Sequence, residues 1–255
     1  MSHTEPAMLE ARELKKSFNG HVVLDGVSFS IARGESVVII GRSGSGKSVL
    51  LKLLIGLLRP DSGEVWVAGE NISTMDERQL MRVRKRFGMV FQGAALFDSL
   101  TVAENIAFAF RHDRTISQSE IERRVAEVLE MVDLPGIQNK KPAELSGGMR
   151  KRVGLARAIV YKPEIVLYDE PTTGLDPIVA DSINQLILRV RDRLGVTTVV
   201  VTHDMRSARC LAHRILMLHD GRIYASGAPD EFFASTDPVV RQFIDGVSNP
   251  KEVYF

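Results

Sequence analysis

Gly41–Ser48 has the sequence Gly-Arg-Ser-Gly-Ser-Gly-Lys-Ser and fits the phosphate-binding pattern G-x-x-x-x-G-K-[ST]. The largely apolar run Ser36–Ile40 precedes it and predicts a buried strand, and the run Val49–Ile55 follows it and predicts a buried helix. Strand, glycine loop and helix in this order are the context that the pattern requires. We therefore expect backbone N–H groups and the positive end of the helix dipole to bind phosphate here.

Two side chains at the end of this loop have specific expected roles. Lys47 would place positive charge on the β- and γ-phosphates of a nucleotide, and the Ser48 hydroxyl would ligate Mg²⁺. A glycine-rich turn with a chance lysine is the alternative, but both flanking elements argue against it. The loop predicts a nucleotide-binding protein, but it does not indicate which process the nucleotide drives.

The composition is that of a soluble globular protein. With 255 residues, 44% hydrophobic and 25% charged, the chain can bury a full core in one or two domains. A net charge of +1 gives no global positive field, which argues against nucleic acid as a partner. A single cysteine, Cys210, excludes an intrachain disulfide and indicates a reducing compartment. Met1–Leu9 lacks the apolar core of a secretory signal, and no apolar run reaches the ~20 residues of a membrane helix, so any membrane role would go through a partner.

The remaining pattern predicts strands that alternate with helices. Alternation of apolar and polar residues from Leu9 to Ile31 predicts an antiparallel hairpin region with a turn at Lys16–Gly20, whereas 93–110 has no clear period. Asp220–Gly221 predicts a hairpin turn, and two short helices follow it. Further strands are expected at 64–69, 87–91, 164–169, 197–202 and 214–218, and further helices at 76–86, 117–134, 146–161, 177–194 and 204–212.

This order predicts an α/β fold with a parallel core sheet. The short early strands add a small antiparallel layer, and the helical stretch 92–161 interrupts the core as an insertion. We expect a single domain over 1–245, with the inserted helical part at about 93–161, and a tail over 246–255. The basic cluster that ends the helix at 76–86 is interpreted first as a solvated helix face and second as an interaction patch.

Acidic residues end one of the predicted strands. Ile165–Asp169 is apolar until its last residue, and acids at the carboxyl end of a strand lie where ligands bind in open α/β sheets. Asp169 would hold the Mg²⁺ that Ser48 also ligates, and Glu170 would orient or deprotonate the attacking water. An ordinary pair of acids between strand and loop is the alternative.

A second helix start also has the features of an anion site. In Leu145–Met149, Ser146 is a natural N-cap, and Gly147 and Gly148 leave the first N–H groups uncovered. A glycine-rich cap that serves packing alone is the alternative.

Taken together, these motifs resemble those of ABC-type ATPase subunits, over about residues 9–236. The resemblance implies a P-loop NTPase fold with a mostly parallel RecA-like core sheet, an antiparallel β subdomain and an inserted helical subdomain, and ATP hydrolysis coupled to transport. In the family's order, the motifs are the Walker A loop Gly41–Ser48, the Q-loop residue Gln92, the signature Leu145–Met149, the Walker B strand Ile165–Asp169 with Glu170, the D-loop Gly174–Pro177 and the switch histidine His203.

The resemblance implies a head-to-tail homodimer. Each ATP would lie between the Walker A loop of one chain and the signature loop of the other. The presence of two helix starts agrees with this arrangement, because both cannot reach one γ-phosphate unless two chains pair. Phe18 stands where the family has an aromatic that stacks on adenine, and a core phenylalanine is the alternative.

The site residues that the resemblance implies fall into three groups. The catalytic residues would be Glu170, His203 and Gln92, and the Mg²⁺ ligands would be Ser48, Gln92 and Asp169. ATP would be bound by Phe18, Gly41, Ser43, Gly44, Ser45, Gly46, Lys47, Ser48, Val49, Ser146, Gly147, Gly148 and Asp176.

Within the family, the chain most resembles the ATPases of Mla/Mce-type lipid transporters. Met149 stands where the family usually has glutamine, the basic run Arg150–Arg152 follows it, and Phe91–Val102 is similar to that subgroup. This resemblance implies phospholipid transport with a permease, an MCE-domain lipid-binding protein and often a STAS-domain protein, at the cytoplasmic face of the bacterial inner membrane. The alternatives are an amino-acid or ion importer and, more distantly, an ABC protein of DNA repair or translation or a P-loop nucleotide kinase.

Overall fold

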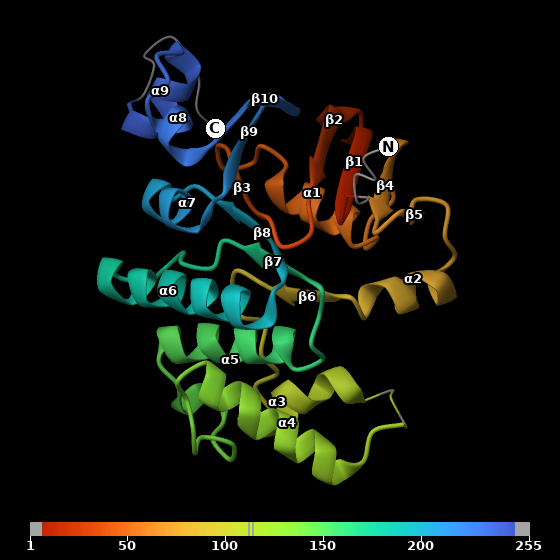
Figure 1. Cartoon of the computed structure of the whole chain (residues 1–255), viewed down its shortest axis with the longest axis vertical. Coiled ribbons are helices and arrows are strands. Elements are labelled where there is room, and N and C mark those ends of the chain that lie inside the picture. The colour runs from red at the N-terminus through yellow and green to blue at the C-terminus, as the bar shows by residue number, and fades with distance from the viewer. Residues whose placement is uncertain (1–6, 112, 114, 248–255) are drawn as a thin grey trace, which may run out of the picture.

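The computed structural model describes residues 7–111, 113 and 115–247, which form two sheets and the helices around them (Figure 1). The strands are β1 (Leu9–Phe18), β2 (His21–Ile31), β3 (Ser36–Ile40), β4 (Ser62–Val67), β5 (Glu70–Asn71), β6 (Phe87–Val90), β7 (Ile165–Asp169), β8 (Thr197–Thr202), β9 (Arg214–His219) and β10 (Arg222–Gly227). The helices are α1 (Lys47–Leu54), α2 (Glu77–Arg84), α3 (Val102–Ala107), α4 (Gln118–Met131), α5 (Gly147–Ile159), α6 (Pro177–Leu194), α7 (Met205–Leu211), α8 (Pro229–Phe233) and α9 (Pro238–Asp245), with the 3-10 turns η1 (Phe108–Phe110) and η2 (Pro142–Glu144).

The six-stranded sheet has the order β10-β9-β3-β8-β7-β6, and its strands pair in parallel except for β10 at one edge. Along β3, Val38 and Ile40 join one apolar cluster, and Val37 and Ile39 join the other. A sheet that is covered on both faces needs apolar residues at successive positions, which explains the apolar run Val37–Ile40 of β3. The predicted parallel α/β core is confirmed.

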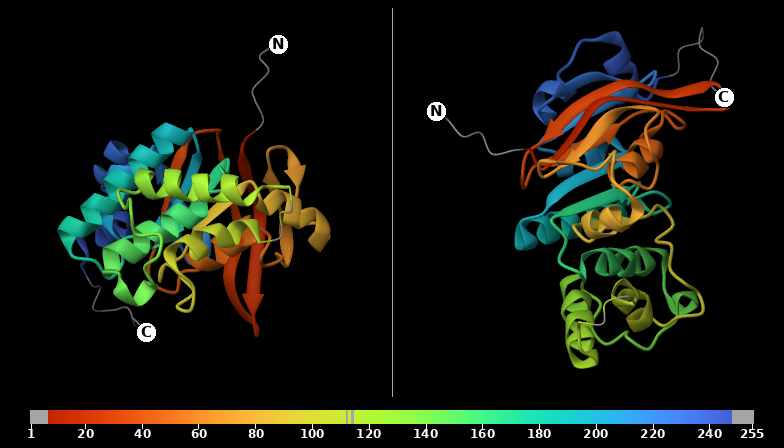
Figure 2. Two further views of the ribbon diagram at one scale, coloured as in Figure 1. Left: turned by 90° about the horizontal axis from the view of Figure 1, so that it is seen from below. Right: turned by 90° about the vertical axis from the view of Figure 1, so that its right-hand side faces the viewer.

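The two faces of this sheet have different partners. On one side α1 packs between the core sheet and the antiparallel sheet β2-β1-β4-β5, with Leu50 and Leu54 fully buried. On the other side lie α5, α6 and α7, and α3 and α4 pack beyond α5. The helices between β6 and β7 therefore form the end of the molecule that is far from the antiparallel sheet (Figure 2).

Helix α5 lies directly against strand β6. A Cβ atom at Gly88 would be 2.3 Å from the carbonyl oxygen of Ala158, so only glycine fits at this crossing. Because α5 begins at the signature glycines, this close contact links the signature helix to the edge of the core sheet.

The first hairpin has a shorter turn than the one predicted at 16–20. Strand β1 continues to Phe18, which pairs with His21, and Asn19 and Gly20 alone form the turn, with φ values of 50° and 81°. Positive φ at both central residues is typical of the turns that match the twist of a two-stranded ribbon. Phe18 therefore belongs to a strand and not to the turn.

The stretch 93–110, for which no element was predicted, contains α3 and η1. Thr101 Oγ1 accepts a hydrogen bond from the Glu104 N–H (3.2 Å), and the Glu104 carboxylate accepts one from the Thr101 N–H (2.7 Å). This capping box starts a helix of only six residues, too short to show a period.

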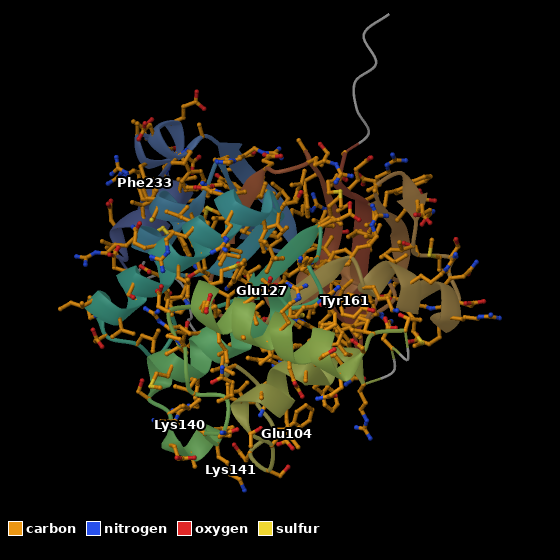
Figure 3. All side chains as sticks on the ribbon, turned by 60° about the horizontal axis from the view of Figure 1, so that its bottom comes forward. Glu104, Glu127, Lys140, Lys141, Tyr161 and Phe233 are labelled. Carbon is orange, nitrogen blue, oxygen red and sulfur yellow. The ribbon has the colours of Figure 1, made fainter. Side chains whose placement is uncertain are left out.

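Charged side chains on the surface are mixed in sign. In the basic cluster at the end of α2, Arg84 pairs with Glu77, and Lys85 Nζ lies 3.3 Å from Asp113 Oδ2. These ion pairs favour the interpretation as a solvated helix face. Figure 3 shows acidic and basic side chains, among them Glu104, Glu127, Lys140 and Lys141, around the end formed by the inserted helices.

The C-terminal region is described as far as Val247. Gly246 ends α9 with a φ of 64°, and most of the tail predicted at 246–255 lies outside the described residues. Within the described part of the chain, no helix combines the length and apolar character needed to cross a bilayer.

Candidate active site

The loop Gly41–Ser48 joins β3 to α1, in the order expected. Gly44 and Gly46 have φ values of 78° and 97°, a region that favours glycine. Gly46 is the N-cap of α1 and makes no side-chain cap, and a Cβ atom there would lie 2.8 Å from Val23 Cγ1. The loop therefore requires glycine for both conformation and space, and no side chain of the cap residue covers the first N–H groups of α1.

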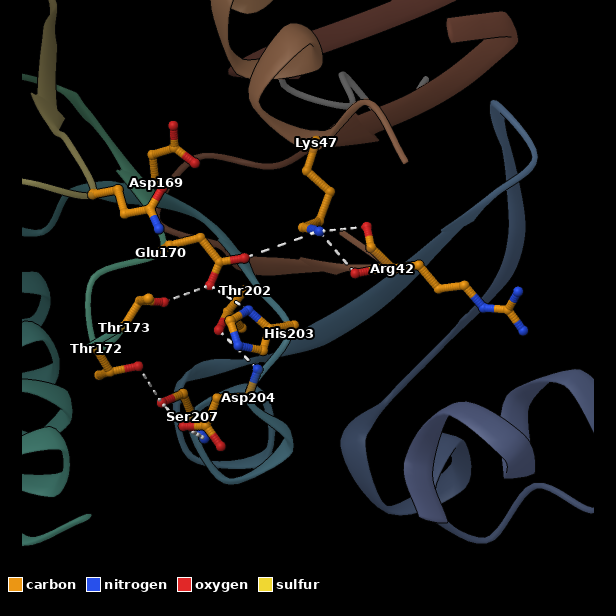
Figure 4. Close-up of polar contacts among 12 residues, drawn as sticks. Arg42, Lys47, Asp169, Glu170, Thr172, Thr173, Thr202, His203, Asp204 and Ser207 are labelled. Carbon is orange, nitrogen blue, oxygen red and sulfur yellow. Dashed lines mark hydrogen bonds and ion pairs between the residues drawn. The ribbon is translucent and has the colours of Figure 1, made fainter. Parts of the chain in front are cut away.

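The Lys47 ammonium is enclosed by the loop. Its Nζ donates to the carbonyl oxygens of Gly41 (2.7 Å) and Arg42 (2.9 Å) and lies 3.9 Å from Glu170 Oε1 (Figure 4). Burial lowers the pKa of Lys47, while the carboxylates of Glu170 and Asp169 act in the opposite direction. The loop thus holds a buried cation on acceptors that the oxygens of a phosphate group can replace.

The two acids at the carboxyl end of β7 occupy different surroundings. Ser48 Oγ donates to Asp169 Oδ1 at 3.0 Å, and burial raises the pKa of Asp169 against the effect of this hydrogen bond. Glu170 has a φ of 50°, and its N–H donates to the carbonyl oxygen of Val201 at 2.9 Å. A non-glycine residue in the left-handed region is strained, and such residues cluster at functional sites.

The Glu170 carboxylate is oriented by two neighbours. Its Oε2 lies 2.9 Å from His203 Nδ1 and accepts a hydrogen bond from Thr173 Oγ1 at 3.0 Å. Glu170 is buried, whereas the His203 side chain is 59% exposed. The carboxylate is thus fixed on one side by His203 and Thr173 and faces Lys47 on the other (Figure 4).

Hydrogen bonds through Ser207 of α7 connect the two loops that carry Glu170 and His203. Thr172 Oγ1 lies 3.3 Å from Ser207 Oγ, and Ser207 Oγ donates to Asp204 Oδ2 at 2.5 Å. Asp204 is also the N-cap of α7. The loop after β7 and the loop after β8 are therefore held together by residues that do not line the cavity.

A cavity of about 1030 Å³ opens beside these groups. The sequence did not indicate that α9 contributes to its wall through Val239, Gln242 and Phe243, nor that Thr173 contacts Glu170. Gln242 lies 200 positions after Arg42, whose Nη2 approaches Gln242 Oε1 at 3.3 Å, and no local pattern indicates such a contact. The predicted residues that line the cavity are Ser43, Gly44, Gly46, Lys47, Ser48, Val49, Gln92, Glu170 and His203.

Some predicted residues lie outside the cavity lining. Gly41 and Asp169 do not line the cavity themselves. Gly41 accepts a hydrogen bond from Lys47, and Asp169 accepts one from Ser48, and both donors line the cavity. Phe18 is 42% exposed at the end of β1, so its stacking on adenine stays a prediction. Ser45 Oγ is buried away from the cavity surface.

The signature loop forms a second, separate cluster. Ser146 is the N-cap of α5, as predicted, and its Oγ accepts from the Met149 N–H at 3.2 Å. Ser146, Gly147 and Gly148 do not line the cavity, and a Cβ atom at Gly148 would lie 2.9 Å from Val179 Cγ1. Asp176, the N-cap of α6, accepts from the Val179 N–H at 3.0 Å. The signature loop thus packs against the first turn of α6, which the D-loop residue Asp176 caps, and it lies outside the cavity that the phosphate loop of the same chain lines.

Comparison with known proteins gives one family. Residues 24–173 match the family described as ABC transporter. A dimeric structure of the ATP-binding cassette MJ0796, in a post-hydrolysis state bound to ADP and Pi, superposes with a TM-score of 0.80 at 35% identity, covering 87% of this chain and 99% of that chain.

Three curated relatives are similar over nearly all of this chain. Protein TRIGALACTOSYLDIACYLGLYCEROL 3, chloroplastic, of Arabidopsis thaliana is 40% identical over 263 residues, which cover 96% of this chain and 76% of that protein. The intermembrane phospholipid transport system ATP-binding protein MlaF of Escherichia coli K12 is 37% identical over 249 residues, which cover 98% and 93%. The probable ribonucleotide transport ATP-binding protein mkl of Mycobacterium leprae is 41% identical over 238 residues, which cover 93% and 69%.

Proposed function

This chain belongs to the ABC transporter family as an ATP-binding and ATP-hydrolysing subunit, and we propose that its hydrolysis powers phospholipid transport between bacterial membranes through a separate permease. The observation that carries the choice of cargo is the 37% identity to the phospholipid transport protein MlaF, which extends over 98% of this chain. The 40% identity to a chloroplast protein named for a galactolipid supports the same class of cargo. The name of the mycobacterial relative favours a second candidate, ribonucleotide transport.

We propose that the phosphates of ATP bind along the loop Gly41–Ser48. The uncovered N–H groups at the start of α1 and the Lys47 ammonium would meet the phosphate oxygens. Lys47 would exchange the carbonyl oxygens of Gly41 and Arg42 for these stronger, charged acceptors. The charge of the polyphosphate would then compensate the buried cation in place of the Glu170 carboxylate, which is 3.9 Å away.

The residues near the loop fit a Mg²⁺ ion. Ser48 Oγ and Asp169 Oδ1 lie 3.0 Å apart, and Gln92 lines the same cavity. Hydroxyl, carboxylate and amide oxygens are ligands of the kind that Mg²⁺ takes, one or two from the protein and the others from phosphates and water. When bound, the ion would neutralise charge that develops on the phosphate oxygens. Ser48, Gln92 and Asp169 would hold it.

We propose Glu170 as the general base for the attacking water. Its carboxylate faces the cavity and is oriented by His203 and Thr173, which leaves Oε1 directed toward Lys47 and the phosphate loop. A base must be fixed within hydrogen-bond reach of the proton that it takes, and these contacts provide that orientation. His203, which also lines the cavity, would contact the γ-phosphate.

A second copy of the chain would complete the site. The signature loop can bind an anion through the N-terminus of α5 but lies outside the cavity of its own chain. A head-to-tail homodimer would place the Ser146–Gly148 loop of one chain, with Asp176 beside it, against the γ-phosphate bound to the other. The dimeric state of the MJ0796 cassette supports this arrangement.

The partners and location follow from the same proposal. Transport requires an integral-membrane permease, and exposed apolar side chains after Gln92, including the 44% exposed Phe97, would contact it. An MCE-domain lipid-binding protein and a STAS-domain protein would belong to the same assembly. The chain would then be peripheral, at the cytoplasmic face of the inner membrane.

The choice of cargo is tested on the chain purified with the membrane proteins that accompany it. We expect phospholipid vesicles containing phosphatidylethanolamine and phosphatidylglycerol to change its rate of ATP hydrolysis, while added ribonucleoside monophosphates leave the rate unaltered. The measurement is phosphate release in detergent and in vesicles, with Glu170→Gln as the blank. A response to ribonucleotides without a response to phospholipid would reject lipid as the cargo and favour the second candidate.

A further inference from the structure

Three basic residues follow the signature glycines on α5, and the middle one differs from its neighbours. Arg152 points away from the nucleotide site, and its guanidinium donates to Asp133 Oδ2 after α4 at 2.8 Å and to Ser182 Oγ on α6 at 2.7 Å. Arg150 donates to its own helix start, at the carbonyl oxygen of Leu145. Lys151 alone extends toward the nucleotide site, and only 8% of its surface is exposed.

The Lys151 ammonium joins two main-chain segments of the active site. Its Nζ donates to the carbonyl oxygen of Gln92 and to that of Glu170, the latter at 3.2 Å. Gln92 follows β6 and Glu170 follows β7, and these strands are paired in parallel. One side chain of the signature helix therefore holds the ends of two neighbouring strands.

The ammonium group of Lys151 is buried beside groups that compensate part of the cost of burying its charge. Burial lowers the pKa of Lys151, and the carboxylates of Glu170 and Asp169 act in the opposite direction. A buried charge is retained only where opposite charges and hydrogen bonds compensate it. The acids of the nucleotide site supply the charge, and the two carbonyl groups supply the hydrogen bonds.

The same face of α5 also fixes the segment after Gln92. Ala94 and Ala95 have φ values of 60° and 47°, which are strained for alanine. Arg157 donates to the carbonyl oxygens of both, each at 2.7 Å. Gly154 lies between, where a Cβ atom would be 3.3 Å from Ala94 Cβ. Positions 151, 154 and 157 thus form one continuous contact with the Gln92–Ala95 segment.

Glu170 is strained in the same way, with a φ of 50°. Its N–H is fixed by the carbonyl oxygen of Val201, and its own carbonyl oxygen accepts from Lys151 and, at 3.3 Å, from the Thr173 N–H. Strained conformations persist where the surroundings over-determine them. Lys151 is the part of these surroundings that comes from the signature helix.

We propose that Lys151 is a positioning residue for ATP hydrolysis, which fixes the main chains of Gln92 and Glu170 to the helix that carries the signature loop. Docking of that loop onto the ATP of a second copy would then set the positions of Gln92 and Glu170 in the first chain. The inference rests on the proposed catalytic role of Glu170. Lys151 does not line the cavity and touches neither ATP nor water in this scheme.

The test compares Lys151→Met with Arg152→Met in the full-length chain. Lys151→Met is expected to lower kcat by about 10²-fold, the effect of a small misplacement of catalytic groups. The KM for ATP should stay within about threefold of the original, because the substitution removes no contact with the bound nucleotide. Lys151→Arg should recover part of kcat. Arg152→Met also removes one charge and several side-chain hydrogen bonds from α5, and it should keep kcat within about threefold at a similar loss of Tm.

Two outcomes would overturn the inference. One is a folded Lys151→Met protein with the original kcat. The other is a loss of kcat that matches that of Arg152→Met at equal Tm, which would show a structural role only. If Lys151→Met does not fold, Lys151→Gln, which keeps an amide donor, is measured by the same criteria. Hydrolysis by Glu170→Gln at the original rate would instead count against the proposed function of Glu170.

Discussion

Replacing Glu170 with glutamine is expected to stop ATP hydrolysis while ATP binding persists. Glutamine keeps the shape of the side chain and can still accept the hydrogen bond from Thr173, but it cannot take a proton from water. A positioned general base is typically worth about 10²–10⁴ in rate. Because ATP then remains in the site, we also expect the variant to form a more stable dimer in the presence of ATP.

The matched control is Glu164→Gln, the same substitution at the opposite end of β7. Glu164 accepts from Arg86 Nε at 2.7 Å, far from the cavity lining, so its loss should leave hydrolysis close to the original rate. Phosphate release gives the rate, and size-exclusion chromatography with and without ATP gives the dimer fraction. Turnover by purified Glu170→Gln at the original rate would remove Glu170 from its proposed role.

Replacing Lys47 with alanine is expected to weaken ATP binding and to abolish hydrolysis. The ammonium is the charge-assisted donor that the loop offers to the phosphates, and such bonds contribute about 1.5–3 kcal/mol. That corresponds to about a 10- to 150-fold increase in Kd for ATP. Without Lys47, the carboxylates of Asp169 and Glu170 would also repel the polyphosphate, which adds to the loss.

Lys52→Ala is the control for this prediction, since Lys52 is an exposed lysine further along α1. It should change the Kd by no more than about threefold, the scale of a screened surface charge. Titration calorimetry with a non-hydrolysable ATP analogue measures both variants. Equal affinities for Lys47→Ala and Lys52→Ala would show that the ammonium does not bind phosphate.

The sequence predicted those parts of the site whose conformation depends on contacts between residues that are close together in the chain. Strand, loop and helix are contiguous at Gly41–Ser48, and the left-handed φ of Gly46 and the exposed start of α1 follow from that order. Ser146 was predicted as an N-cap for the same reason, because a cap depends on the next three residues. Even the missed helix α3 had a local signal in the pair Thr101 and Glu104.

Such local patterns do not predict contacts between segments that are far apart in the sequence. Phe18 was assigned to a turn because the extent of β1 is set by its pairing with β2, which a single strand pattern does not show. The cavity wall formed by α9 depends on the packing of the C-terminal helices against the core sheet. Lys151 had a usable signal: it shares a helix face with Leu155 and Ala158, both buried, so a lysine there is unusual.

The central claim is that each ATP site is shared between two chains, and heterodimers of two inactive variants test it directly. Lys47→Ala damages the phosphate loop, and Ser146→Arg removes the N-cap of α5 and fills its anion site. Each homodimer should be inactive. In a heterodimer, the intact signature loop of the Lys47→Ala chain meets the intact phosphate loop of the Ser146→Arg chain, so one shared site is whole.

The measurement is ATP hydrolysis by heterodimers isolated through two different affinity tags. A heterodimer of the unaltered chain with Lys47→Ala has one whole site under either arrangement and shows whether one site suffices for turnover. We predict that the heterodimer of Lys47→Ala with Ser146→Arg hydrolyses ATP at a rate similar to that control. A heterodimer as inactive as its parents, beside an active control, would contradict the shared site.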